Sequence, residues 1–171
     1  MELPPYEIII VENNGLRPTY LDTLGCKVHY TINNFLPTHN IGIKEIKDIF
    51  SCIDTYKIQD SDFIVKMTGR YSIHEDSEFL KEVKALSTTQ YDCILKYGSF
   101  ANPVNYPMND CITGLIGMKC AYVKKIAMPH IGECIEWNWA AITFTMDKEK
   151  VHRVNTLGID ICPGSNTYFS V

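Results

Sequence analysis

Several motifs that mark common nucleotide-dependent enzymes are missing from this sequence of 171 residues. It has no G-x-G-x-x-G after its first apolar run, which disfavours a dinucleotide oxidoreductase of the usual type. It has no G-x-x-x-x-G-K-[ST] either, which disfavours a P-loop phosphotransferase. A glycine-rich methyltransferase loop is also missing, so the common glycine-rich nucleotide sites are disfavoured.

The sequence also lacks an excess of positive charge and a long apolar run. Its 16 Lys and Arg residues stand against 20 Asp and Glu residues, so there is no general attraction to nucleic acid or to anionic membranes. No apolar run approaches the roughly 20 residues that span a bilayer, and the segment MELPPYE lacks the features of a signal peptide. We therefore expect a soluble cytoplasmic protein with no nucleic-acid partner and only local anion sites.

Spacings typical of metal ligands are missing as well. The seven cysteines include no C-x-x-C pair, and neither they nor the five histidines show the spacing of a zinc site. We expect the cysteines to be reduced and mostly buried, and we expect no metal ligands among these residues.

Short apolar runs alternate with amphipathic segments through the first hundred residues. The predicted strands are 6–11, 26–31, 62–67 and 91–98, and the predicted helices are 17–24, 43–53 and 76–86. This alternation predicts a single α/β domain, 1–171, with a mostly parallel sheet and helices on both faces.

The remaining residues continue the alternation after a long loop without periodicity. The predicted elements are the loop 99–109, a strand at 111–117, and helices at 118–127, 133–144 and 147–158. The helix at 133–144 contains both tryptophans of the chain.

Polar and cationic side chains follow the first three predicted strands. Ligands of an open parallel sheet bind outside the carboxyl ends of its strands, so we expect these side chains to converge. Asn side chains suit a base or a ribose, while Lys, Arg and a helix N-terminus suit phosphate oxygens. The candidate donor-binding residues are Asn13, Asn14, Arg17, Asn40, Gly42, Lys66, Thr68, Gly69, Arg70 and Tyr71.

These candidates also have simpler structural interpretations. Asn-Asn-Gly at 13–15 is typical of a turn, and Asn40 is typical of a helix N-cap. Lys66 and Arg70, taken singly, are typical of solvated surface cations. We favour a ligand site because these residues occur together at the predicted edge of one sheet.

The segments YEIIIVENNGLRPTYLDTL, NIGIKEI, DFIVKMTGRY and CITGLIGMKCAYVKKI together resemble small glycosyltransferases with a GT-A-type fold. Such enzymes are encoded in polysaccharide-building gene clusters and by large DNA viruses, and K-x-T-G-R-Y is the most distinctive motif shared with them. The resemblance implies a Rossmann-like, nucleotide-sugar-binding architecture. It also implies transfer of a hexosyl or pentosyl unit from a nucleotide sugar to a glycan or glycoconjugate acceptor, with donor binding in 1–100 and the acceptor side in 101–171.

The sequence departs from the GT-A pattern at the metal site. GT-A enzymes usually end this strand in Asp-x-Asp, which binds a divalent cation, but the only Asp-x-Asp here, at 60–62, precedes the strand. We interpret it as a polar turn. Lys66, Thr68 and Arg70 stand at the expected position, where cations would neutralise the leaving diphosphate directly. We therefore expect a metal-independent transferase without a cofactor.

An inverting transfer needs a carboxylate that accepts the proton of the acceptor hydroxyl. Near the start of the tryptophan-containing helix, the resemblance favours Glu136 as this base, then Glu133, with Asp110 as a third candidate. Trp137 and Trp139 are candidates for binding the acceptor sugar. The simpler interpretations are a favourable helix dipole for the acids and core packing for the tryptophans.

Two alternatives to a glycosyltransferase remain open. A sugar nucleotidyltransferase has a similar fold but normally carries a Gly-rich, Arg-containing loop after its first strand, which ENNGLR matches poorly. A non-catalytic module that binds a nucleotide, a glycan or a partner protein is the other alternative, and the missing Asp-x-Asp favours it.

Overall fold

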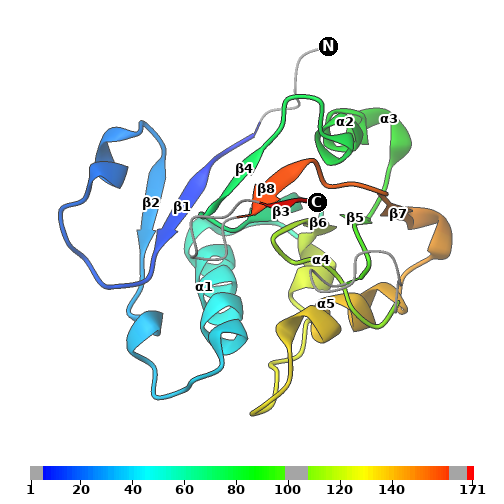
Figure 1. The fold of residues 1–171 in the computed structure, drawn as a ribbon. Coiled ribbons are helices and arrows are strands. Elements are labelled where there is room, and N and C mark those ends of the chain that lie inside the picture. The colour runs from blue at the N-terminus through cyan, green and yellow to red at the C-terminus, as the bar shows by residue number, and fades with distance from the viewer. Residues whose placement is uncertain (1–5, 99–107, 162–168) are drawn as a thin grey trace. The chain divides into compact units, whose positions relative to one another are not determined.

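The computed structural model describes residues 6–98, 108–161 and 169–171, and the chain forms two compact units (Figure 1). Of the described residues, unit 1 contains 60–98, 108–127, 136–161 and 169–171, and unit 2 contains 6–59 and 128–135. Most of the loop predicted at 99–109 lies outside the described residues.

Unit 2 consists of a parallel strand pair and one long helix. Its elements are β1 (Ile9–Glu12), η1 (Tyr20–Thr23), β2 (Lys27–Tyr30), η2 (Asn33–Phe35) and α1 (Ile41–Tyr56), where η marks a 3-10 helix. Strands β1 and β2 pair in parallel (Figure 1), with Ile9 opposite Lys27 and Glu12 opposite Tyr30. The predicted strand at 26–31 is confirmed in its central residues, and the predicted strand at 6–11 is confirmed in its second half, 9–11.

The amphipathic pattern of 43–53 is confirmed as part of α1. Its N-cap is Asn40, whose side chain accepts a hydrogen bond from the backbone NH of Gly42 at 2.9 Å. Ile46 and Ile53 are among the residues that it buries. The helix predicted at 17–24 is wrong in kind, because only the single 3-10 turn η1 forms there.

Unit 1 contains two sheets. Its strands are β3 (Phe63–Met67), β4 (Tyr71–Ile73), β5 (Cys93–Leu95), β6 (Leu115–Lys119), β7 (Val151–Arg153), β8 (Ile159–Ile161) and β9 (Phe169–Ser170). The four-stranded sheet has the order β3-β6-β5-β7, and the three-stranded sheet has the order β4-β8-β9. In the first sheet, β6 runs antiparallel to both β3 and β5, while β7 runs parallel to β5. The second sheet is antiparallel.

Short helices and an apolar core complete unit 1. The helices are α2 (Glu78–Lys84), α3 (Leu86–Thr89), α4 (Cys120–Val123), α5 (Ile135–Thr143, of which only Ile135 belongs to unit 2) and the 3-10 turn η3 (Lys148–Lys150). The core cluster comprises Phe79, Ile94, Ile112, Leu115, Val154, Leu157, Ile159 and Ile161. Glycine is required at Gly117, because a Cβ there would lie 2.5 Å from the Phe63 ring. No helix within the described ranges is both long and apolar enough to cross a bilayer.

The predicted mostly parallel, Rossmann-like sheet with helices on both faces, as in a GT-A fold, is wrong. The parallel pairs are β1 with β2 and β5 with β7, and the remaining pairs of named strands are antiparallel. The prediction assumed that successive strands are linked by helical crossovers and lie in one sheet. Instead, a β-turn formed by residues 68–71 leads from β3 directly into β4, and β3 pairs with β6, which is distant in the sequence.

The helix predicted at 147–158 is also wrong. Its first residues form η3 with Asp147 as N-cap, and the chain then extends into β7. The three- and four-residue spacing of Val151, Val154 and Leu157 suggested a helix. Pairing with β5 decides the matter instead, because it satisfies the backbone of a segment that starts with a β-branched residue.

Candidate functional site

The K-x-T-G-R-Y motif ends β3 and forms the turn into β4, in unit 1. The backbone NH of Tyr71 donates to the carbonyl oxygen of Thr68 at 3.1 Å, which closes a β-turn. Gly69 and Arg70 occupy its exposed tip, and Arg70 makes no hydrogen bond or ion pair with any other described residue. Tyr71 packs against the core of unit 1. The turn therefore presents one guanidinium group to solvent.

Lys66, near the end of β3, contacts the loop that precedes β6. Its Nζ donates to the carbonyl oxygen of Thr113 at 2.5 Å and to Oγ1 of Thr68 at 3.1 Å. The backbone NH of Thr68 in turn donates to the carbonyl oxygen of Gly114 at 2.9 Å. Lys66 is therefore held in place by the protein and is not a freely solvated surface cation.

Glu136, in the first turn of α5, belongs to the same group of contacts. Oγ1 of Thr113 donates to Oε1 of Glu136 at 3.4 Å, and Sγ of Cys111 donates to the Glu136 carbonyl oxygen at 3.3 Å. Thr113 thus contacts both a lysine and a glutamate that were predicted as site residues. We call Lys66, Thr68, Asp110, Thr113 and Glu136 the unit 1 cluster.

Asp110 adds a second carboxyl group to the unit 1 cluster. Burial raises the pKa of Asp110 above its ordinary value of 3.8, and the negative charge of Glu136 raises it further. A hydrogen bond from the backbone NH of Cys111 acts in the opposite direction. Asp110 therefore lies close enough to Glu136 for their charges to interact.

The remaining acceptor-side candidates are Glu133, Trp137 and Trp139. Glu133 belongs to unit 2, where its Oε2 accepts a hydrogen bond from the backbone NH of His130 at 2.8 Å. Trp137 is 47% exposed, whereas Trp139 is 1% exposed. The interpretation of Trp139 as a platform for the acceptor sugar is therefore wrong, because its ring is packed in the core. Trp137 keeps an accessible ring.

The candidate Asn13 contacts a buried acid in unit 2. Asp48 of α1 is 6% exposed, and it accepts three hydrogen bonds. Its Oδ2 accepts from Nδ2 of Asn13 at 3.1 Å, while its Oδ1 accepts from Oγ1 of Thr31 and from Nδ2 of Asn33, each at 2.6 Å. Asp48 therefore ties the segments that follow β1 and β2 to the helix.

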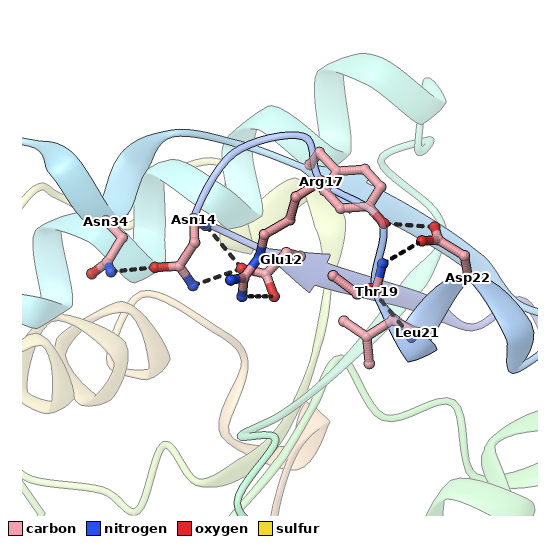
Figure 2. A network of polar contacts seen from close by, with 8 residues as sticks. Glu12, Asn14, Arg17, Thr19, Leu21, Asp22 and Asn34 are labelled. Carbon is pink, nitrogen blue, oxygen red and sulfur yellow. Dashed lines mark hydrogen bonds and ion pairs between the residues drawn. The ribbon is translucent and has the colours of Figure 1, made fainter.

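Asn14 and Arg17 form a second network with Glu12, which Figure 2 shows. Oε1 of Glu12 accepts from Nδ2 of Asn14 at 2.6 Å, and Oε2 pairs with Nη2 of Arg17 at 3.3 Å. The hydrogen bonds from Asn14, and then the Arg17 guanidinium, lower the pKa of Glu12. Oδ1 of Asn14 accepts from Asn34 at 2.6 Å. A ligand anion at Arg17 would therefore compete with Glu12.

Asn40 and Gly42 have structural roles, as the simpler interpretation of Asn40 predicted. Besides capping α1, Asn40 donates from Nδ2 to the carbonyl oxygens of His130 and Glu133, at 3.2 and 2.9 Å. A Cβ at Gly42 would lie 2.5 Å from Cβ of Ile135, so a larger residue does not fit. These contacts hold the segment 128–135 against the start of α1.

A shallow cavity of about 540 Å³, widely open to solvent, lies within unit 2. Its lining residues are Leu16, Tyr30, Thr31, Ile32, Asn33, Lys47 and Ser51. Lys47 is the charged residue of this lining, and it forms no ion pair with any residue that the structure describes. Two lining residues, Thr31 and Asn33, are those held by Asp48. The cavity suits a small polar or anionic molecule.

The Asp-x-Asp at 60–62 anchors a helix of unit 1. The backbone NH groups of Cys120 and Ala121 donate to the carbonyl oxygens of Asp62 and Asp60, and Lys124 pairs with Asp60 at 2.7 Å. This segment precedes β3 and holds α4, in agreement with its interpretation as a structural turn. Within the described part of the chain, no three His, Cys, Asp or Glu side chains are grouped as metal ligands would be.

The predicted donor-binding residues divide between the two units. Residues 13, 14, 17, 40 and 42 belong to unit 2, and residues 66 and 68–71 belong to unit 1. Strand β3 is not in the sheet of β1 and β2, so the sheet-edge argument for their convergence does not hold. The structure does bring together four predicted residues of unit 1, namely Lys66, Thr68, Asp110 and Glu136.

Sequence reasoning missed three residues that organise these sites. Thr113 lay within a predicted strand, and Asp48 lay on the presumed polar face of a helix, where it resembled its neighbour Lys47. No local pattern distinguishes Thr113 or Asp48, because their contacts are made with distant residues. Lys47 is one of the charged residues of the same predicted amphipathic helix, 43–53, and nothing in that pattern marks it as a lining residue.

Comparison with known protein families, with curated proteins and with solved structures finds no match to this chain. The resemblance of K-x-T-G-R-Y and its companion segments to glycosyltransferases therefore rests on the sequence motifs alone.

Proposed function

We propose that the chain transfers a glycosyl unit from a nucleotide sugar to an acceptor hydroxyl. The observation that carries this proposal is the unit 1 cluster, in which Thr113 contacts both Lys66 and Glu136. A fixed ammonium group beside a carboxylate supplies the two functions that the reaction needs. One neutralises the leaving diphosphate, and the other accepts the proton of the nucleophile.

In the proposed reaction, the acceptor oxygen bonds to the anomeric carbon while the bond from that carbon to the diphosphate oxygen breaks. Glu136 takes the hydroxyl proton, and the nucleoside diphosphate leaves with the bonding electron pair. Lys66 and the exposed Arg70 bind the diphosphate oxygens. Because both are permanent cations of the chain, the proposed reaction requires no divalent metal.

The first experiment is a thermal-shift screen of nucleoside diphosphates and their sugars, since a selective ligand raises the melting temperature by mass action. The ligand found is then titrated calorimetrically into Lys66→Met and Arg70→Ala. Loss of one charge-assisted hydrogen bond of about 1.5–3 kcal/mol should weaken binding by roughly 10- to 150-fold. Lys84→Met is the matched control, because Lys84 is an exposed lysine of α2 in the same unit.

The second experiment tests Glu136 as the base. Glu136→Gln should lower kcat by about 10²- to 10⁴-fold and leave donor affinity nearly unchanged, since general base catalysis contributes that much. Glu149→Gln, an exposed acid of η3, is the control. Equal turnover of Glu136→Gln and the wild-type protein removes Glu136 from this role. Loss of turnover on addition of a chelator, restored by magnesium or manganese, contradicts the metal-independent mechanism.

A non-catalytic binding module is the second candidate, and the cavity of unit 2 favours it. Lys47 brings to that cavity a positive charge that has no ion-pair partner in the described part of the chain. Binding of a nucleotide sugar that is lost in Lys47→Met, with neither hydrolysis nor transfer, supports this alternative. Pyrophosphate-dependent release of a nucleoside triphosphate would instead identify a sugar nucleotidyltransferase.

A further inference from the structure

We infer that Thr113 is a positioning residue that holds the cation and the base of the unit 1 cluster at a fixed separation. This inference rests on the proposed function. Thr113 is 5% exposed, and it contacts the two oppositely charged groups through different atoms. Its carbonyl oxygen accepts from Nζ of Lys66, and its hydroxyl donates to Oε1 of Glu136.

The backbone around Thr113 is fixed by hydrogen bonds on both sides. The NH of Ile112 donates to the carbonyl oxygen of Lys96 at 2.9 Å, and the carbonyl oxygen of Gly114 accepts from the NH of Thr68 at 2.9 Å. The first bond ties the loop to the residue after β5, and the second ties it to the residue after β3. Thr113 therefore has little freedom to move, and neither have the two groups that it contacts.

The threonine hydroxyl also contacts the carboxylate of Glu136, for which no other side-chain hydrogen bond is found in residues 6–98, 108–161 and 169–171. Two titratable groups that precede β6, Asp110 and Cys111, interact electrostatically with Glu136. The charged group on β3 is Lys66, which contacts Thr113. Asp110 repels the Glu136 carboxylate, and Cys111 bonds its backbone carbonyl rather than its side chain. Among the side chains that the structure describes, the hydroxyl of Thr113 is thus the donor to the Glu136 carboxylate.

The separation of cation and base matters because the two act on opposite sides of the reacting carbon. The diphosphate leaves from one side, and the deprotonated hydroxyl approaches from the other in an inverting displacement. A misplacement of about 1 Å can lower turnover by about 10²-fold. A residue that contacts both groups therefore controls kcat more than substrate affinity.

The test compares Thr113→Val with Thr113→Ser. Valine has nearly the same shape but no hydroxyl, whereas serine keeps the hydroxyl, and both keep the carbonyl oxygen that binds Lys66. We expect Thr113→Val to lower kcat by about 10- to 100-fold with the donor KM unchanged, and Thr113→Ser to stay within about threefold of the wild type. Calorimetric affinity for inorganic pyrophosphate should be unchanged in Thr113→Val and reduced in Lys66→Met.

A readout without turnover tests the same contact. The ¹³Cδ signal of Glu136, assigned as the one missing in Glu136→Gln, should move in Thr113→Val and stay in place in Thr113→Ser at pH 7. An unmoved signal in Thr113→Val overturns the inference, as does a wild-type kcat. Should valine prevent folding, Thr113→Ala takes its place with the same expectations.

The outcomes separate this inference from the proposed function. Failure of wild-type protein to bind pyrophosphate or to turn over any nucleotide sugar refutes the proposed function, while the Glu136 signal still tests the Thr113 contact. Conversely, equal losses of pyrophosphate affinity and kcat in Thr113→Val show a general structural role. That result overturns the positioning role and leaves Lys66 and Glu136 in the proposed mechanism.

Discussion

Replacing the buried Asp48 by alanine should destabilise unit 2 more than any substitution of an exposed acid in α1. The change removes the acceptor of hydrogen bonds from Asn13, Thr31 and Asn33. These bonds connect the helix to the residues after β1 and β2, and Thr31 and Asn33 also line the cavity.

The magnitude follows from the number and exposure of the three donors. A hydrogen bond to a charged acceptor contributes about 1.5–3 kcal/mol when its loss leaves a buried group unsatisfied. The three donors here are only partly buried, so water replaces part of each contact, and about 1 kcal/mol per bond is the better figure. We therefore expect Asp48→Ala to cost about 3 kcal/mol, and Asp48→Asn, which keeps one acceptor oxygen, about half of that.

The assay is native-state hydrogen exchange of the α1 amides, because it reports on unit 2 separately from the rest of the chain. The matched control is Asp54→Ala, which removes an exposed carboxylate from the same helix and should change stability by less than about 0.5 kcal/mol. If Asp48→Ala is no more destabilising than Asp54→Ala, the three hydrogen bonds do not hold the unit together.

Three further predictions concern Gly69, Asp110 and the thiols. Gly69→Ala should leave the melting temperature unchanged, because a Cβ at this position meets no atom within 4 Å and the φ of Gly69 is not positive. Weaker binding of a nucleotide sugar by this variant would indicate that the ligand approaches the backbone of the turn. Asp110→Asn should stabilise the protein near pH 7, because the pKa of Asp110 is raised in the folded state and its ionisation therefore opposes folding. This gain, measured by urea unfolding, should vanish below pH 3.8, the ordinary pKa, because Asp110 is then protonated in both states. An equal gain at both pH values contradicts this reasoning. A thiol reagent should label the exposed Cys134 before the buried Cys93 and Cys111, because burial raises the pKa of both buried thiols; peptide mapping by mass spectrometry checks the order.

Much of the local structure of this protein could be predicted from the sequence. Asn40 before an apolar pattern with helical spacing indicated α1, and Asp76 or Ser77 before another indicated α2, whose N-cap is Ser77. The run FIVKM identified β3. These predictions succeed because caps and apolar periodicity act between residues a few positions apart. The polar character of the turn after β3 was also visible, as Lys66 and Thr68 show.

The sequence alone thus determined several helices and strands and the chemistry of the residues beside them, because those properties depend on near neighbours in the chain. Only the tertiary structure decided that β3 pairs with β6 and that the segment starting at Val151 is a strand. It also decided that Trp139 is buried and that Thr113 contacts Glu136. The physical reason is the same in each case: the hydrogen bonds and packing that select these outcomes come from residues far away in the sequence, and their energies outweigh the local preference.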